Sequence, residues 1–209
     1  MGAEQNDKQP LLVWVDCEMT GLDTVKDALV EIAVLVTDSE LNVIGDGVDV
    51  VIKATPEQLA GMDEFVTKMH TDSGLIEKIP NGITVSEAED LILKFLENSG
   101  VASGKSPLAG NSVYVDRMFI ARDMPRLSGY LHYRTVDVSS IKELTRRWYP
   151  KVYFNSPAKT GNHRALGDIK DSIAELAFYR ATVFVNQPGP DSAAIKEISK
   201  QINSELGGN

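Results

Sequence analysis

The chain has 209 residues, of which 43% are hydrophobic and 24% are charged, and its formal net charge is −9. The length and the hydrophobic content predict one globular domain with a substantial core. The acidic balance argues against a protein that grips long nucleic acid, because such binding relies on a basic surface. The chain therefore either does not bind polyanions or binds a small anionic substrate in a local pocket.

Strand patterns occupy the first part of the chain, over residues 11–18, 28–37 and 41–53. The polar turn at 38–40 separates the second run from the third and predicts an antiparallel meander. Gly45 and Gly47 lie inside the third run and predict a kink or a bulge there.

Helical patterns then alternate with short strands. Helices are predicted at residues 56–62, 63–70, 86–97, 115–123, 139–148 and 163–183, and strands at 107–111 and 133–138. This order predicts an α/β fold with a mixed β-sheet flanked by helices.

Two of the predicted helices carry clear apolar stripes. The helix at 86–97 has Ser86 as a candidate N-cap, with Glu89 three residues later. The inward positions expected from helical spacing are Ala88, Leu91, Ile92, Phe95 and Leu96 in this helix, and Ile169, Ile173, Leu176 and Ala177 in the helix at 163–183.

Composition divides the chain into a polar segment at 1–10, a domain at 11–187 and a tail at 188–209. The tail has isoleucines at helical spacing, so we expect either a helix docked on the body, which we favour, or a flexible appendage. No stretch reaches the length of a transmembrane span, and the opening segment has no signal-peptide pattern. We therefore expect a cytoplasmic protein that does not contact a membrane.

Asp16 and Glu18 end the first predicted strand, directly after an apolar run. Residues two apart on a strand point the same way, so the two carboxylates lie side by side, while Cys17 points to the opposite face and into the core. Buried like charges repel each other, and both stay ionised only if a cation lies between them. The pair therefore suits a hard divalent cation, or else it is an exposed pair at a strand end.

Two later segments add polar groups of the same kind. Asp116 follows the strand at 107–111 at the entry to a helix, and His163 opens the long helix in which Asp168 lies beside the apolar stripe. The simpler alternative is that Asp116 and Asp168 are favourable charges at helix starts.

This ordered set resembles the DEDDh exonuclease superfamily of the ribonuclease H-like fold. The matching features are the DxE pair, Asp116 after GNS, and His163 five residues before Asp168. The phrases WVDCEMTGLD, HYR, DVSSIKELTRRWYP and HRALGDIKDSIAEL resemble the oligoribonuclease family, and FVNQPGPDS resembles the ending of its actinobacterial members. At Gly167 the chain departs from the usual pattern, in which a second Asp precedes the metal-binding one.

The resemblance implies a metal-dependent 3′-to-5′ exoribonuclease that hydrolyses very short RNA oligomers, dinucleotides including pGpG, to nucleoside 5′-monophosphates. It implies two divalent cations per site, Mg²⁺ or Mn²⁺, which Asp16, Glu18, Asp116 and Asp168 would hold, and His163 as the general base. Residues 11–187 would then be the exonuclease domain.

The resemblance also assigns contacts with the bases of the RNA. Leu22 and Phe65 would wedge and stack the two terminal bases, which requires no particular base sequence. The family usually has Trp where Phe65 stands. From the residues alone, Phe65 fits a helix core position equally well, and Leu22 fits a packed position.

The remaining implied contacts concern phosphates and a second subunit. His70 would lie near the scissile bond, and Ser112, Arg134 and Ser139 would bind the 5′ phosphate, for which the planar donor fork of arginine is suited. Tyr133 would reach the catalytic site of the neighbouring subunit in a homodimer.

Three alternatives remain at the level of sequence. A proofreading-type DNA exonuclease would use the same four carboxylates. A non-catalytic nucleic-acid interaction protein could retain this fold, although all five catalytic positions are present. A phosphotransfer hydrolase with an Asp nucleophile usually has Asp-x-Asp, whereas Glu18 occupies the second place here.

Overall fold

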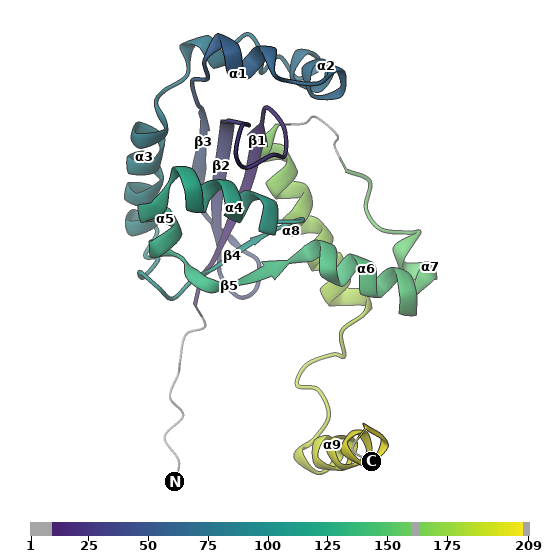
Figure 1. Cartoon of the computed structure of the whole chain (residues 1–209). Coiled ribbons are helices and arrows are strands. Elements are labelled where there is room, and N and C mark those ends of the chain that lie inside the picture. The colour runs from purple at the N-terminus through teal and green to yellow at the C-terminus, as the bar shows by residue number, and fades with distance from the viewer. Residues whose placement is uncertain (1–9, 160–163, 207–209) are drawn as a thin grey trace.

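The computed structural model describes residues 10–159 and 164–206. Its centre is a five-stranded sheet in the order β3-β2-β1-β4-β5 (Figure 1). The pairs β1–β2 and β2–β3 are antiparallel, whereas β1–β4 and β4–β5 are parallel, which confirms the predicted meander and mixed sheet. The strands are β1 Leu12–Met19, β2 Leu29–Thr37, β3 Val43–Val51, β4 Pro107–Gly110 and β5 His132–Asp137.

Helices cover both faces of this sheet (Figure 1). The helices are α1 Pro56–Ala60, α2 Glu64–Asp72, α3 Val85–Asn98, α4 Tyr114–Asp123, α5 Pro125–Tyr130, α6 Val138–Trp148, α7 Pro150–Tyr153, α8 Ala165–Thr182 and α9 Ser192–Leu206, with a 3₁₀ turn at Ile79–Asn81. All predicted strands and helices are present within a few residues of their expected bounds. The sequence patterns did not predict α5, α7 or the 3₁₀ turn, which are all short.

The alternation of β1 builds two separate cores. Val13, Val15 and Cys17 point to the face covered by α3, α4 and α5, where the free thiol of Cys17 is buried as predicted. Trp14 points to the other face and packs against α8. Because residues two apart share a face, Asp16 and Glu18 follow Trp14 on the α8 side.

The predicted kink in β3 is present. Gly45 and Gly47 have φ of +74° and +83°, which side chains other than glycine rarely adopt. A Cβ at Gly47 would also lie 2.5 Å from Cδ2 of Leu35. The register with β2 shifts between Val34 and Val36, opposite this stretch.

The predicted cap of α3 is wrong. The N-cap is Thr84, whose Oγ1 accepts a hydrogen bond from the backbone N–H of Glu87, while the Glu87 carboxylate accepts from the backbone N–H of Thr84 at 2.9 Å. The helix begins earlier because Thr84 and Glu87 form a complete capping box, which leaves Ser86 inside the first turn.

Two predicted inward positions are also wrong. Leu91 is 47% exposed and Ala177 is exposed. In each case the neighbouring residue, Ile92 or Leu176, occupies the buried line, and one residue corresponds to a rotation of about 100° around a helix. In α8 the buried line continues instead to Tyr179, which is fully buried.

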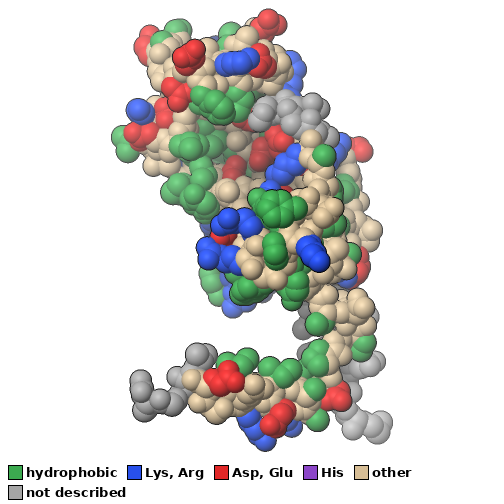
Figure 2. Space-filling model, turned by 90° about the vertical axis from the view of Figure 1, so that its right-hand side faces the viewer, with side chains coloured by type: hydrophobic (Ala, Val, Ile, Leu, Met, Phe, Trp, Pro, Cys, Tyr) green, Lys and Arg blue, Asp and Glu red, His purple; other side chains and the backbone are tan. Residues whose placement is uncertain are grey.

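Helix α9 lies apart from the rest of the chain (Figure 1). Ile195, Ile198 and Ile202 are about half exposed, at 52%, 51% and 48%. In Figure 2 one side of this helix is apolar and the other is charged. Within residues 10–159 and 164–206, no helix combines the length and apolar character needed to cross a membrane.

A buried ion pair fixes the start of α8. Glu31 of β2 is completely buried, and its carboxylate accepts hydrogen bonds from Nε and Nη2 of Arg164. The backbone N–H of Ala165 donates to the same carboxylate at 3.3 Å. Arg164, the N-cap residue of α8, supplies no side-chain cap itself. Glu31 therefore caps this helix from a neighbouring strand and holds its first turn against the sheet.

Arg164→Ala should lower the free energy of unfolding by about 3 kcal/mol, because it leaves the buried Glu31 charge without its partner. The matched control is Arg180→Ala, which removes an exposed pair with Glu40 and should cost less than about 1 kcal/mol. Urea unfolding followed by circular dichroism measures both. Equal losses in the two variants would contradict the structural role of the Glu31–Arg164 pair.

Candidate active site

Three carboxylates meet where β1 ends beside α8. Single oxygens of Asp16, Glu18 and Asp168 all lie within 4.8 Å of one another. Glu18 is 8% exposed, and the other two are half-buried. Figure 2 shows acidic side chains gathered in the upper middle of this face, above α6 and α7. A compact group of carboxylate oxygens fits a hard divalent cation.

Asp116 joins this group from the other side of β1. The strand β4 ends at Gly110, and the helix that follows, α4, brings Asp116 to β1, where its Oδ1 accepts a hydrogen bond from the backbone N–H of Cys17 at 2.8 Å. Asp116 is buried, and its negative charge raises the pKa of both Asp16 and Glu18. The structure therefore brings all four predicted metal ligands together.

Ionising all of these carboxylates is unfavourable in free energy unless positive charge is added. Burial, followed by repulsion from neighbouring carboxylates, raises the pKa of Glu18 to about 8 and that of Asp16 well above its ordinary value. Burial raises the pKa of Asp116 to about 7, although the hydrogen bond from Cys17 acts in the opposite direction. Arg164 favours the ionised form of Glu18, but it is already paired with Glu31. A donor set of this kind fits divalent cations.

His70 lies behind Glu18 and has no exposed surface. Its Nε2 lies 2.9 Å from the backbone carbonyl of Met19, so Nε2 carries the proton that this acceptor requires. Its Nδ1 lies 3.9 Å from Oε2 of Glu18 and is, among the described residues, the buried side-chain atom left without a hydrogen bond. The proximity of His70 to the scissile bond stays a prediction, and the neighbour seen here is Glu18, a predicted metal ligand.

The two residues predicted to contact bases both lie on the surface. Leu22 is 72% exposed in the loop between β1 and β2, and Phe65 is 75% exposed in the first turn of α2. The alternatives that Phe65 belongs to a core and that Leu22 is packed are therefore wrong. Exposed apolar side chains of this kind are available to a base, and the assignment itself stays a prediction.

The residues predicted to bind the 5′ phosphate form two small groups. Oδ1 of Asp137 accepts hydrogen bonds from the backbone N–H of Ser112, the backbone N–H of Ser139 and the Ser139 hydroxyl, at 3.0, 2.9 and 2.6 Å. Nearby in sequence, Nε of Arg134 donates to the Tyr133 hydroxyl at 3.2 Å, and both side chains are exposed. Asp137 thus aligns the two serines, a role that the sequence did not suggest.

The remaining predicted residue, His163, lies outside the described residues. The neighbouring Arg164 and its partner Glu31 were missed at the level of sequence. A signal existed, because Glu31 is the one charged residue in the strand LVEIAVLVT. A lone acid in a strand that is buried along its whole length needs a partner.

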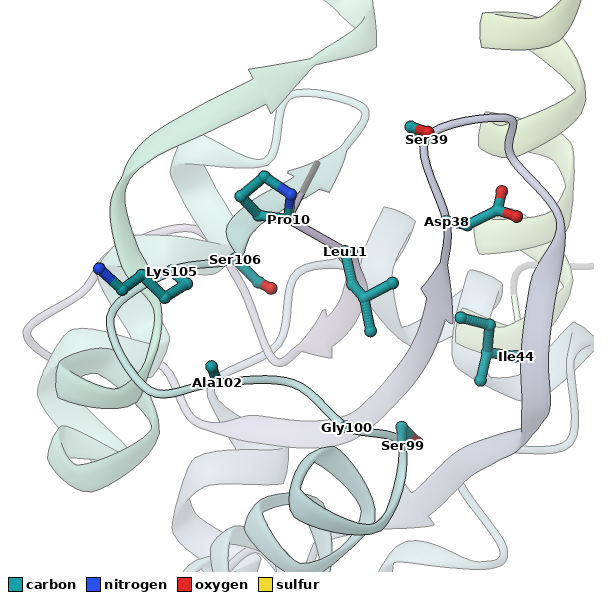
Figure 3. A pocket seen from close by; sticks show the side chains of 10 residues that line it. All are labelled: Pro10, Leu11, Asp38, Ser39, Ile44, Ser99, Gly100, Ala102, Lys105 and Ser106. Atoms are coloured by element: carbon teal, nitrogen blue, oxygen red, sulfur yellow. The ribbon is translucent and has the colours of Figure 1, made fainter. Parts of the chain in front are cut away.

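A cavity of about 810 Å³ lies at the opposite end of the sheet. Figure 3 shows that its side chains come from the residues just before β1, the turn after β2, the strand β3 and the segment between α3 and β4. Asp38 and Lys105 are its charged lining residues. This cavity contains none of the predicted site residues.

Solved structures share the fold of this chain. An exonuclease I structure superposes on 86% of the chain with a TM-score of 0.66 at 16% identity. The zinc-bound form of the Escherichia coli exonuclease I complex with single-stranded DNA superposes on 84% with a TM-score of 0.66, also at 16% identity. The chain spans only 42% and 41% of those two chains. The ribonuclease H-like fold with its mixed sheet is thereby confirmed.

Sequence comparison gives much closer relatives. An exonuclease family (RNase_T) matches residues 13–176. The oligoribonuclease of Streptomyces griseus is 58% identical, over 92% of this chain and 96% of its own length. That of Cutibacterium acnes is 52% identical over 95% and 98%, and that of Mycobacterium avium is 55% identical over 92% and 90%. The chain therefore belongs to the oligoribonuclease family of exonucleases.

Proposed function

We propose that this protein is a 3′-to-5′ exoribonuclease that hydrolyses very short RNA, dinucleotides such as pGpG in particular, to nucleoside 5′-monophosphates. The observation that carries the proposal is the meeting of Asp16, Glu18 and Asp168 within 4.8 Å, in a chain that belongs to the oligoribonuclease family. Asp116 is the fourth member of this acidic group.

Two divalent cations, Mg²⁺ or Mn²⁺, are the proposed cofactors, and the four carboxylates would hold them. When bound, the cations would activate water and neutralise charge that develops on the phosphate. The support from the structure is the raised pKa of Asp16, Glu18 and Asp116, since a group of acids that resists ionisation in water-poor surroundings suits a cation.

His163 is the proposed general base, which would take a proton from the attacking water. Its neighbour Arg164 is held by the buried Glu31, and Asp168 lies in the first turn of the same helix. The Glu31–Arg164 pair would therefore fix the backbone on which both the base and one metal ligand depend.

The substrate would be held at its two ends. Leu22 and Phe65 would contact the bases, and a phenylalanine offers less stacking area than the Trp that is usual in the family. Ser112, Arg134 and Ser139 would bind the 5′ phosphate, a contact that excludes longer strands. Affinity would then come from a closed pocket rather than a basic track, which is consistent with the net charge of −9.

The assembly and the location are further parts of the proposal. Tyr133 is 73% exposed, as it would have to be to reach the site of a neighbouring subunit in a homodimer. The exonuclease domain would span residues 11–187, with the polar segment before it and the tail after it as separate regions. Because its substrate would be the short RNA left by RNA decay, we place the protein in the cytoplasm.

Turnover of RNA and DNA strands of increasing length tests the proposed function. We expect release of mononucleotides only with Mn²⁺ or Mg²⁺, fastest from RNA dinucleotides. Asp16→Asn and Asp168→Asn should each lower the rate at least about 100-fold, since even outer partners of metal ligands contribute 10- to 100-fold. Asp46→Asn, an exposed change on β3, is the matched control.

Three outcomes of that experiment would count against the proposal. Release in the presence of a chelator would exclude metal catalysis. A rate that does not depend on strand length would exclude specialisation for short RNA. Faster cleavage of DNA than of RNA would favour the alternative of a DNA exonuclease. Exonuclease I, which was solved in complex with single-stranded DNA, shares the fold of this chain.

Binding of Mn²⁺ should strengthen as the pH rises toward 8. Without metal, Glu18 and Asp116 have pKa values of about 8 and about 7, so they must release protons before they can act as ligands. The dissociation constant should fall by up to about tenfold per pH unit for each proton released. Isothermal titration at several pH values, with proton release measured in buffers of different ionisation enthalpy, checks this.

The same pKa values predict how the stability of the metal-free protein depends on pH. The folded-state pKa of Glu18 lies above its ordinary value of 4.5, so the folded protein retains a proton that the unfolded chain releases. The free energy of unfolding should therefore fall as the pH rises from about 4.5 to about 8, and Mn²⁺ should reverse the loss. If the Mn²⁺ affinity stayed constant as the pH rises toward 8, the assignment of Glu18 and Asp116 as metal ligands with raised pKa values would be contradicted.

Arg134→Ala should lower kcat/KM for a dinucleotide with a 5′ phosphate by about 10- to 100-fold, because it removes a charge-assisted contact. The same variant should cleave a small phosphodiester that lacks the 5′ phosphate nearly as fast as the unchanged protein does. Arg147→Ala, which removes an exposed partner of Glu143, is the control. Equal losses on both substrates would show that Arg134 does not bind the 5′ phosphate.

A further inference from the structure

The loop between β1 and β2 is held by a residue far away in sequence. Arg122, in the last turn of α4, donates from Nη1 to the carbonyl of Thr24 at 2.6 Å and from Nη2 to the carbonyl of Asp27 at 2.9 Å. The other side of its guanidinium is paired with both carboxylate oxygens of Asp123, at 2.7 and 2.6 Å. The fork of Arg122 is thus fixed between a carboxylate and the two loop carbonyls.

The loop has little apolar packing at its tip to hold it in place. Leu22 and Val25 are 72% and 91% exposed. The internal contacts of the loop are polar, and Asp27 is their centre: its carboxylate accepts from the backbone N–H of Asp23 at 2.8 Å, and its own N–H donates to the carbonyl of Asp23 at 2.9 Å. The loop is therefore held by polar contacts, and those that join its tip to α4 come from Arg122.

Gly21 is part of the same construction. A Cβ at this position would lie 2.3 Å from Oδ2 of Asp27, so the carboxylate packs directly against the glycine backbone. Gly21 is therefore the residue type that admits this close approach, directly before the exposed Leu22. The Asp27 carboxylate occupies the inner side of the loop beside Gly21 and Asp23.

Helix α4 thus has two attachments that matter for the site. Its first turn carries Asp116, which is bonded to Cys17 of β1, and its last turn carries Arg122. Hydrogen bonds between Thr20 and Ala28 hold the base of the loop at the end of β1, and α4 links the rest of the loop to Asp116.

We propose that Arg122 is a positioning residue for substrate binding, which holds the 20–28 loop so that Leu22 meets the terminal base of the RNA. This inference rests on the proposed function, in which Leu22 contacts a base. Arg122 itself touches no substrate and acts through the loop.

A double-mutant cycle on an RNA dinucleotide tests this. Leu22→Ala and Arg122→Ala should each raise KM by about fivefold or more with kcat nearly unchanged, because both remove binding that is equal in the ground state and the transition state. The double variant should have the same KM as Leu22→Ala alone, since Arg122 acts through Leu22. Arg122→Lys, which can reach one carbonyl but lacks the fork, should give an intermediate KM.

Two controls separate positioning from a general loss of structure. Arg180→Ala removes an exposed ion pair at a distant place on α8 and should leave KM unchanged. Binding of Mn²⁺, measured by titration calorimetry, should be unchanged in Arg122→Ala and Arg122→Lys, because Asp116 keeps its bond to Cys17. Weaker Mn²⁺ binding in both variants would overturn the inference, since Arg122 would then support the metal site.

The remaining outcomes distinguish this inference from the function on which it rests. If Leu22→Ala raises KM and Arg122→Ala does not, the inference fails and the proposed function stands. The inference also fails if Arg122→Ala raises KM by the same factor with and without Leu22. If Leu22→Ala leaves KM unchanged, the base contact in the proposed function fails, and the inference fails with it.

Discussion

The crowding of four carboxylates at one end of β1 is the constraint on which the rest of the structure depends. Like charges a few ångströms apart repel strongly where water is scarce, and each loses hydration on burial. Within the part of the chain that the structure describes, little positive charge is available there, because Arg164 is committed to Glu31 and Lys159 is partly exposed. A site of this kind is stable in its ionised form when cations complete it, which is the chemistry of the exonuclease family to which the chain belongs.

The four carboxylates depend on three different features of the fold. Asp16 and Glu18 need only the alternation of β1, which puts them on the face that Trp14 shares with α8. Asp168 needs α8 to begin at a fixed place, and Glu31 provides this from β2 by capping the helix. Asp116 needs β4 to end early, so that α4 can approach the backbone of β1.

The periodic features of the fold could be predicted from the sequence, because they depend on local patterns. The shared face of Asp16 and Glu18 follows from the period of two in strands. The meander follows from the polar turn at 38–40, and the kink in β3 follows from Gly45 and Gly47. The errors lie where two local solutions compete. Thr84 and Ser86 both suit a helix cap, and only the pairing with Glu87 decides between them. Leu91 lies one residue from the buried line of α3.

Contacts between distant segments could not be predicted in this way. The bond between Glu31 and Arg164 joins residues 133 apart, and that between Arg122 and Asp27 joins residues 95 apart. Nothing in either local pattern specifies the partner. Asp137 shows the same limit, since its sequence position suggests a helix cap and its contact with Ser112 depends on how β4 and β5 pair.

The double attachment of α4 also restricts how this enzyme can diverge. A substitution that tilts the helix would shift Asp116 against Cys17 and Arg122 against the 20–28 loop at the same time. The α4 backbone therefore couples the acidic group to the 20–28 loop, whereas a change of side chain at one attachment leaves the other in place. Lineages that acquire a new preference would have to do so through side chains that leave the α4 backbone in place.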